Sequence, residues 1–205
     1  MTDPAAPEAV PQSIRRLDTP EAAHLVQLVG GYDDLQTVLV ACERLLALLG
    51  DPLHAPTDPG VEALWTLVLL SYARPFGTGD DRAAAVTEAD LEPAEDEGRE
   101  EVVRRHRVLM HLRDHHADPM VNPRETYTAG VAQDADGRPN AVAVTSVSSP
   151  ALDPQAVRQV GRLAYGLCTV LDTRIGEAQK AILTAVRDTP REQLAEMERI
   201  EVLAD

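Results

Sequence analysis

A long helical repeat of apolar residues near the C-terminus most constrains the fold of this 205-residue chain. The repeat follows Asp153-Pro154, a pair typical of a helix start, because Asp caps free backbone N–H groups and Pro fits the first helical turn. One apolar face then continues toward Val186. Its positions recur every three or four residues: Val157, Val160, Leu163, Leu167, Val170, Leu171 and Ile175. The chain therefore needs further helices against which to bury this face.

Four upstream segments are also predicted to be helical. A short helix over 21–29 is expected to end at Gly30-Gly31, and a second helix covers 32–49. Residues 61–73 are apolar nearly all round, which is typical of a central helix and places Trp65 and Tyr72 in the core. A long helix is expected from 95 to about 117.

A β-hairpin is predicted between the last two long helices. The β-rich runs 126–132 and 141–147 flank Asp136-Gly137, which favours a tight turn. After the long C-terminal helix, Thr189-Pro190 is expected to open a short helix with Glu192 in a capping box. The predicted fold class is mainly α, a helical bundle with one β-hairpin insertion, spanning 126–147, between two long helices.

The net charge of −15 is unevenly distributed. Residues 1–101 hold 20 acidic and 6 basic side chains, whereas residues 102–205 hold 14 and 13. An acidic chain is a poor non-specific binder of nucleic acid, because phosphate contacts need an excess of cations. We expect a flexible N-terminal tail over 1–19, a single helical domain over 20–205, and a solvated acidic loop over 75–94 within it.

The two cysteines, Cys42 and Cys168, lie in apolar helical patterns, so we expect both to be buried thiols. The N-terminus lacks the basic and apolar regions of a signal peptide. The longest apolar stretch, 63–72, is too short to cross a membrane. We expect a cytoplasmic protein with no membrane association, no cofactor and no bound metal.

One segment concentrates the side chains suited to chemistry on a phosphodiester. Residues 104–116 hold four of the six histidines and four arginines, at the C-terminal end of the helix predicted over 95–117. His titrates near neutral pH, and Arg presents a planar fork of donors to phosphate. The structural alternative is that cations collect at helix C-termini because they interact favourably with the helix dipole.

Three segments resemble the HEPN-like helical proteins, a group that includes bacterial toxin and defence ribonucleases. Residues 64–76 are similar to an apolar helix followed by Tyr-Ala-Arg-Pro-Phe, and 106–112 resemble the turns that precede the end of the catalytic helix. Residues 113–118, Arg-Asp-His-His-Ala-Asp, resemble its Arg-Asn/Asp-x-x-Ala-His end. The resemblance covers about residues 32–185.

In active members, the Arg engages phosphate, and a His four to six residues later acts on the ribose hydroxyl or the leaving oxygen without a metal. The resemblance therefore implies that Arg113 holds phosphate, Asp114 orients a neighbour, and His115 or His116 serves as acid/base. The expected His positions hold Asp118, Pro119 and Met120 instead. We therefore expect a catalytically degenerate metal-independent RNase, homodimeric, in RNA-linked stress, defence or toxin–antitoxin biology.

A second hypothesis is a non-catalytic homodimeric helical interaction protein whose acidic surface binds a basic protein partner. His111 and His115 are four residues apart, a spacing that suits a metal, but no third ligand is evident. The serines at the end of the second β-rich run, Ser146, Ser148 and Ser149, lack a nucleophile elbow, and the glycines form no phosphate-binding loop.

Overall fold

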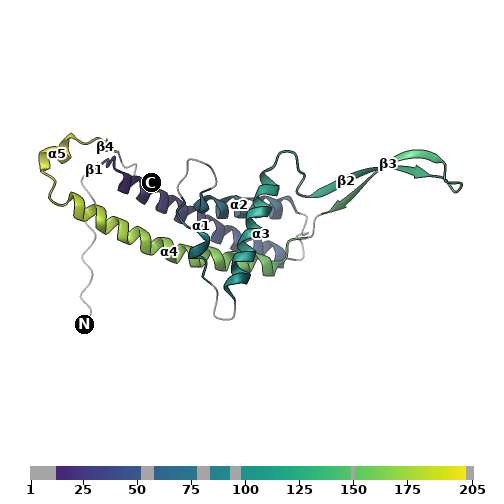
Figure 1. Ribbon diagram of the computed structural model, residues 1–205, viewed down its shortest axis with the longest axis horizontal. Coiled ribbons are helices and arrows are strands. Elements are labelled where there is room, and N and C mark those ends of the chain that lie inside the picture. The colour runs from purple at the N-terminus through teal and green to yellow at the C-terminus, as the bar shows by residue number, and fades with distance from the viewer. Residues whose placement is uncertain (1–12, 52–57, 78–83, 93–97, 149–150, 202–205) are drawn as a thin grey trace.

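The computed structural model describes residues 13–51, 58–77, 84–92, 98–148 and 151–201. Two long helices, α1 (Pro20–Gly50) and α4 (Pro154–Val186), lie side by side along the molecule and share its most extensive helix contact. Helix α2 (Pro59–Ala73) packs on α1, and α3 (Arg99–Ala117) packs on α2, as Figure 1 shows. The predicted mainly α fold is confirmed.

The start and end of α4 confirm the prediction. The Asp153 carboxylate accepts a hydrogen bond from the Gln155 N–H at 3.1 Å, and Pro154 occupies the first helical position. The apolar face that follows is buried against α1. Cys42 and Cys168 are both buried in this core, as expected, and Tyr72 is fully buried. Trp65 is half-buried at the edge of the core.

The predicted helix break at Gly30-Gly31 is wrong, because α1 continues through both glycines. Gly31 is buried, and a Cβ built there would lie 3.1 Å from the Ala85 Cβ and 3.5 Å from Leu171 and Pro75. Because Gly31 has no side chain, these three residues can pack closely against the backbone of α1. Gly30, in contrast, faces open space.

The acidic loop predicted over 75–94 is partly folded onto the helices. Within its described residues, Ala85, Val86 and Leu91 are buried, and Glu88–Asp90 form the 3-10 turn η2. The other 3-10 turn, η1 (Arg74–Phe76), follows α2 directly, and its Pro75 carbonyl accepts hydrogen bonds from the N–H groups of Ala85 and Val86. The solvated-loop prediction is therefore wrong for residues 84–91, because three apolar side chains anchor the segment.

Both described chain ends meet in a short sheet. Strand β1 (Ile14–Arg15) pairs antiparallel with β4 (Arg199–Ile200), which follows helix α5 (Arg191–Glu196). The Arg15 guanidinium also donates to the Met197 carbonyl at 2.7 Å. The tail predicted over 1–19 therefore does not extend through Ile14 and Arg15, and residues 1–12 lie outside the described residues.

Two helix starts differ from the predictions. The N-cap of α5 is Pro190 and makes no side-chain cap bond, so the predicted Thr189–Glu192 capping box does not form. Helix α3 begins at Arg99 rather than at residue 95, with extended Gly98 as its N-cap. Residues 95–97 lie outside the described residues. The C-terminal end of α3 at Ala117 is as predicted.

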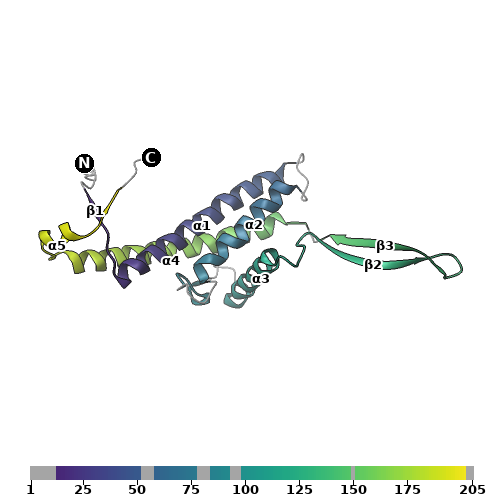
Figure 2. The same cartoon turned by 90° about the horizontal axis from the view of Figure 1, so that it is seen from above.

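The predicted hairpin is confirmed, with β2 (Glu125–Gln133) and β3 (Pro139–Ser148) paired antiparallel from Glu125↔Ser148 to Ala132↔Ala141. Gly137 adopts the left-handed conformation at φ 78° in the turn, which Gly tolerates without strain. Figure 2 shows that the hairpin projects beyond the helices as an arm. No helix in the described parts of the chain is long and apolar enough to cross a membrane.

Candidate functional site

The arginines and histidines of α3 lie in different surroundings, because a helix directs successive side chains to different sides. His106 lies in the core, where its Nδ1 is 3.1 Å from the Tyr72 hydroxyl and its ring centroid is 4.4 Å from that of Phe76. Burial lowers the pKa of His106, and the nearby Glu88 carboxylate offsets part of this effect. His106 is therefore a neutral packing residue.

The first arginines of the segment are paired with carboxylates of the acidic region. Arg107 donates from Nε and Nη2 to the two Glu88 oxygens at 3.0 and 3.1 Å. Glu101 accepts from Arg104 at 2.5 Å and from Arg105 at 3.5 Å. Two carboxylates of the acidic region, Glu88 and Glu101, thus partly neutralise the basic cluster. This arrangement reduces the positive potential that an RNA backbone would meet.

Arg113, the predicted phosphate ligand, is held close to the protein surface. Its side chain is only 22% exposed, and its Nη2 lies 3.1 Å from Asp114 Oδ1. Its Nε is buried and has no hydrogen-bond partner. Asp114 is 65% exposed, so the carboxylate beside the guanidinium is open to solvent. Its negative charge would repel a phosphate that approaches Arg113.

His116 faces α2 rather than Arg113. Its Nδ1 lies 3.4 Å from the Thr66 hydroxyl. Burial lowers the pKa of His116, and the neighbouring His115 adds to the shift, whereas Glu62 opposes it. The rings of His115 and His116 are 6.5 Å apart and nearly perpendicular. Thus His116 is neutral at pH 7 and touches α2, while His115 is exposed.

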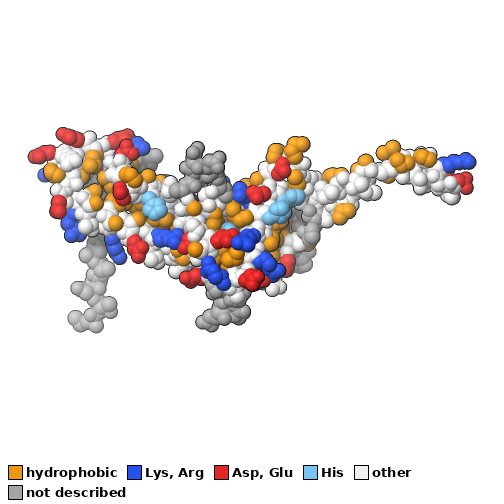
Figure 3. All heavy atoms as spheres, viewed as in Figure 1, with side chains coloured by type: hydrophobic (Ala, Val, Ile, Leu, Met, Phe, Trp, Pro, Cys, Tyr) orange, Lys and Arg blue, Asp and Glu red, His pale blue; other side chains and the backbone are white. Residues whose placement is uncertain are grey.

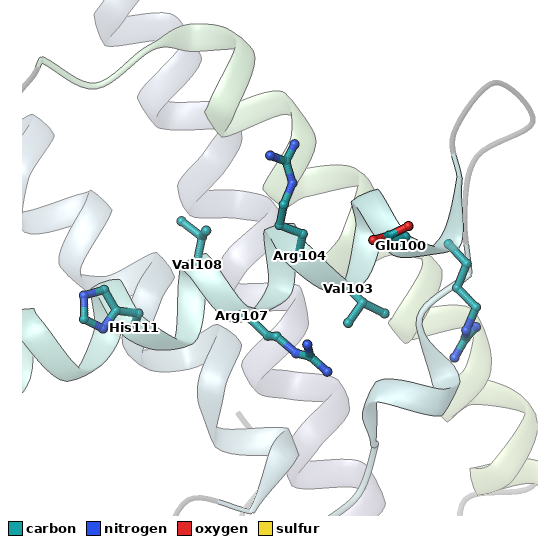
Figure 4. A pocket seen from close by; sticks show the side chains of 7 residues that line it. Glu100, Val103, Arg104, Arg107, Val108 and His111 are labelled. Atoms are coloured by element: carbon teal, nitrogen blue, oxygen red, sulfur yellow. The ribbon is translucent and has the colours of Figure 1, made fainter.

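His111 lies on the exposed face of α3, at a shallow hollow of about 730 Å³. Figure 4 shows Val103 and Val108 between the polar side chains along this face. The other lining residues are Arg99, Glu100, Arg104 and Arg107. Arg113, His115 and His116 do not line the hollow. The exposed face of α3 and the predicted catalytic residues are therefore separate features.

Within the described residues, Arg113 contacts Asp114 and His116 contacts Thr66, and no hydrogen bond joins Arg113 to either histidine. In the same part of the chain, no group of three or more His, Cys, Asp or Glu side chains is placed to hold a metal ion. The sequence interpretation missed Glu62 and Thr66. Their spacing of four residues places both on one face of α2, but nothing in it indicates that this face meets His116.

No protein-family model, no curated protein and no solved structure gives a significant match to this chain.

Proposed function

We propose that this chain is a homodimeric helical interaction protein, HEPN-like in architecture, whose Arg113-to-His116 segment does not cleave RNA. One observation carries the proposal: the guanidinium of Arg113 is mostly covered, and the Asp114 carboxylate lies 3.1 Å from it. A phosphate-holding arginine needs its donors turned toward the incoming anion. Here Nη2 already has an anionic partner on the same helix, and Nε is buried.

The position of His116 supports the same conclusion. A general acid or base must come within hydrogen-bond distance of the group whose proton it moves, and the phosphate ligand must hold that group beside it. The His116 ring instead contacts Thr66 on α2, and the Arg113 guanidinium contacts Asp114. The two side chains therefore do not converge on one reacting group within a single chain.

The acidic surface is a weaker basis for partner binding than its composition indicates. Glu88 is paired with Arg107, Asp90 with Arg174, and Glu101 with Arg104 and Arg105. A basic partner would have to displace these internal cations. We therefore propose that apolar rather than acidic surface mediates the interaction. The setting in RNA-linked stress, defence or toxin–antitoxin biology is the part of the proposal that comes from the HEPN-like resemblance.

The test uses purified full-length protein and mixed RNA in EDTA. We expect no cleavage by wild-type protein, and a dimer by sedimentation. Matched variants on the same helix are Arg113→Ala against Arg104→Ala, and His116→Ala against His111→Ala. Cleavage that disappears in Arg113→Ala and His116→Ala, but persists in the other two, would show that the segment is a nuclease site completed across the dimer.

A further inference from the structure

We infer that the β-hairpin is an exchange arm: its apolar face docks on the groove between α1 and α4 of a second copy of this chain, reciprocally in a dimer. The inference rests on the proposed function, because it specifies how the homodimer is held together.

The hairpin makes few contacts with the rest of its own chain. All ten residues of β3 are exposed, and in β2 only Glu125 and Ala132 are partly buried. An isolated two-stranded hairpin is only marginally stable in water. Figure 3 shows orange apolar side chains along the projecting arm and charged side chains at its tip. A long exposed arm with apolar side chains indicates a surface that is covered in the functional state.

The register separates the arm into two unlike faces. The pairs Ala129↔Val144 and Val131↔Val142 place four apolar side chains on one face, which continues toward the base of the arm with Tyr127↔Ser146 and ends at Glu125↔Ser148. On this apolar face, the exposed fractions are 58% for Tyr127, 61% for Val131, 78% for Val142 and 67% for Val144. The opposite face holds mostly threonine, alanine and glycine, with Val147 near the base of the arm.

The charge distribution of the hairpin disfavours nucleic acids and strongly charged proteins as partners. Residues 126–133 and 139–148 contain no Asp, Glu, Lys, Arg or His, and the turn between them contributes Asp134, Asp136 and Arg138. With Arg138 at the tip as its one cation, against Glu125, Asp134 and Asp136, the hairpin cannot neutralise a phosphate backbone, so nucleic acid is a poor occupant. An uncharged shaft likewise offers nothing to a strongly basic or acidic protein surface. The complementary surface must be apolar.

This chain carries such a surface in the groove between α1 and α4, a hollow of about 470 Å³. Leu39 and Leu46 line it from α1, and Val157, Gly161 and Tyr165 line it from α4. Gly161 leaves the floor open, since a Cβ there would lie 3.9 Å from the Cys42 Cβ. Tyr165 is 68% exposed. Glu43, Arg158 and Arg162 form a polar rim.

The surface area that the hairpin can bury favours a second copy of this chain over an unrelated partner. Strands of 9 and 10 residues make a face about 30 Å long and 10 Å wide, or about 300 Å². If its whole face is covered, by the groove and by the α1 and α4 surface on either side of the groove, one docked arm buries about 600 Å² counting both sides, which is less than a stable interface needs. Reciprocal exchange doubles this to about 1,200 Å², the lower end of the standard range. Two arms packed on each other would bury only about half as much.

The groove also lies within reach of a partner's arm. Strand β3 ends at Ser148, and the groove begins at Val157, one turn into α4. Its lining on α4 from 157 to 165 spans about 12 Å of helix, well under the length of the arm. With the two hairpin bases close to a two-fold axis, each arm can lie along the start of the other copy's α4.

Sedimentation of matched glutamate variants tests the arm. Val144→Glu and Val147→Glu change equally exposed valines on opposite faces of β3. We expect Val144→Glu to weaken dimerisation by about 100-fold or more, because each dimer buries two such carboxylates, and Val147→Glu to leave it unchanged. On α4, we expect Tyr165→Glu to have the same effect as Val144→Glu, with Leu183→Glu as its exposed control. Circular dichroism verifies that the helices remain folded.

Disulfide trapping locates the contact. Oxidising a mixture of Val144→Cys and Tyr165→Cys proteins is expected to give a cross-linked heterodimer. If Val144→Cys cross-links efficiently to itself instead, the arms pack on each other and the exchange is overturned. A wild-type dimer that Val144→Glu and Tyr165→Glu leave intact overturns the inference while the homodimer of the proposed function stands. A monomeric wild type overturns both.

Discussion

The hydroxyl of Tyr72 lies 3.1 Å from Nδ1 of His106, and both side chains are buried where α2 meets α3. The rings of Tyr72 and His106 both pack against Phe76 of η1. A histidine in this position is favoured only in its neutral form, because the charged ring loses its hydration. The pair therefore links protonation to the packing of α3 on α2.

Acidification from pH 7 to pH 5 is expected to destabilise the protein. Burial lowers the pKa of His106 below its ordinary value of 6.5, so the unfolded chain binds a proton before the folded chain does. Stability is therefore full above pH 6.5 and is lost as the pH falls toward the folded pKa, by at most about 1.4 kcal/mol per pH unit. The lowered pKa of His116 acts in the same direction. The carboxylates Glu88 and Asp90 also have lowered pKa values, but their contribution is lost only at still lower pH.

Urea unfolding at pH 7 and pH 5 measures this effect. In His106→Asn, the amide can still pair with Tyr72 but does not titrate, so the variant should lose less stability on acidification than wild type. His24→Asn, at an exposed position of α1, serves as the control. An equal loss in wild type and His106→Asn would show that His106 does not contribute.

Replacing Arg174 by Ala is expected to destabilise the protein by about 1–3 kcal/mol. Arg174 donates to the Ala85 carbonyl at 2.9 Å and to Asp90 at 2.5 and 3.1 Å, and the Asp90 side chain is only 13% exposed. Burial pushes the pKa of Asp90 up, but the Arg174 and Thr87 hydrogen bonds outweigh it and lower the pKa. Without Arg174, a poorly hydrated carboxylate loses its partner.

Arg107→Ala is the matched change for Arg174→Ala, because Arg107 also binds the 84–92 segment, through Glu88. Both partners of that pair are exposed and screened by solvent, so its loss should cost much less stability than the loss of the Arg174 pair. Chemical denaturation of both variants at pH 7 gives the comparison. Similar losses in the two variants would contradict the conclusion that burial distinguishes the two ion pairs.

The neighbouring glycines of α1 should respond oppositely to the same substitution. Gly30→Leu adds a side chain in open space and replaces a weak helix former, so it should raise stability by about 0.5–1 kcal/mol. Gly31→Leu drives a side chain into Ala85, Leu171 and Pro75 and should destabilise by about 1–3 kcal/mol. Thermal unfolding distinguishes them, and equal tolerance at both sites would mean that the 84–92 segment does not pack on Gly31.

Both cysteine thiols should resist modification in the folded protein. Burial raises the pKa of Cys42 to about 11, so at pH 8 only about 0.1% of it is the reactive thiolate. Burial also raises the pKa of Cys168, and a contact of 3.7 Å from Gln36 Nε2 to its sulfur partly offsets the shift. A water-soluble disulfide reagent should therefore react about 100-fold or more faster in denaturant. Rapid labelling of either native thiol would contradict this expectation.

The sequence predicts best the elements that local chemistry determines. Asp153-Pro154 sets the first residue of α4, and Gly137 provides the left-handed turn residue of the hairpin. The Gly30-Gly31 prediction failed because packing of Ala85 and Leu171 on bare backbone outweighs the low helix propensity of glycine. Strands β1 and β4 have two residues each, too few to leave an alternating pattern.

The candidate site was harder to predict because it depends on contacts between helices. Spacing alone places Arg113 and His116 on one side of α3, but not which neighbours they meet. Thr66 of α2 contacts His116, and Asp114 pairs with Arg113. The buried position of His106 likewise follows from α2 and η1, which supply Tyr72 and Phe76.

The pairing of α1 with α4 has a consequence for biosynthesis. The two helices form the largest helix contact, yet 103 residues of chain lie between Gly50 and Pro154. At about 5–20 residues per second, the ribosome completes α1 about 7–27 s before it completes α4. Throughout that interval the apolar side of α1 lacks α4, and only α2, η1 and the 84–92 segment can cover part of it. The nascent chain is therefore a substrate for chaperones that bind exposed leucine-rich helices, until the last quarter of the protein emerges.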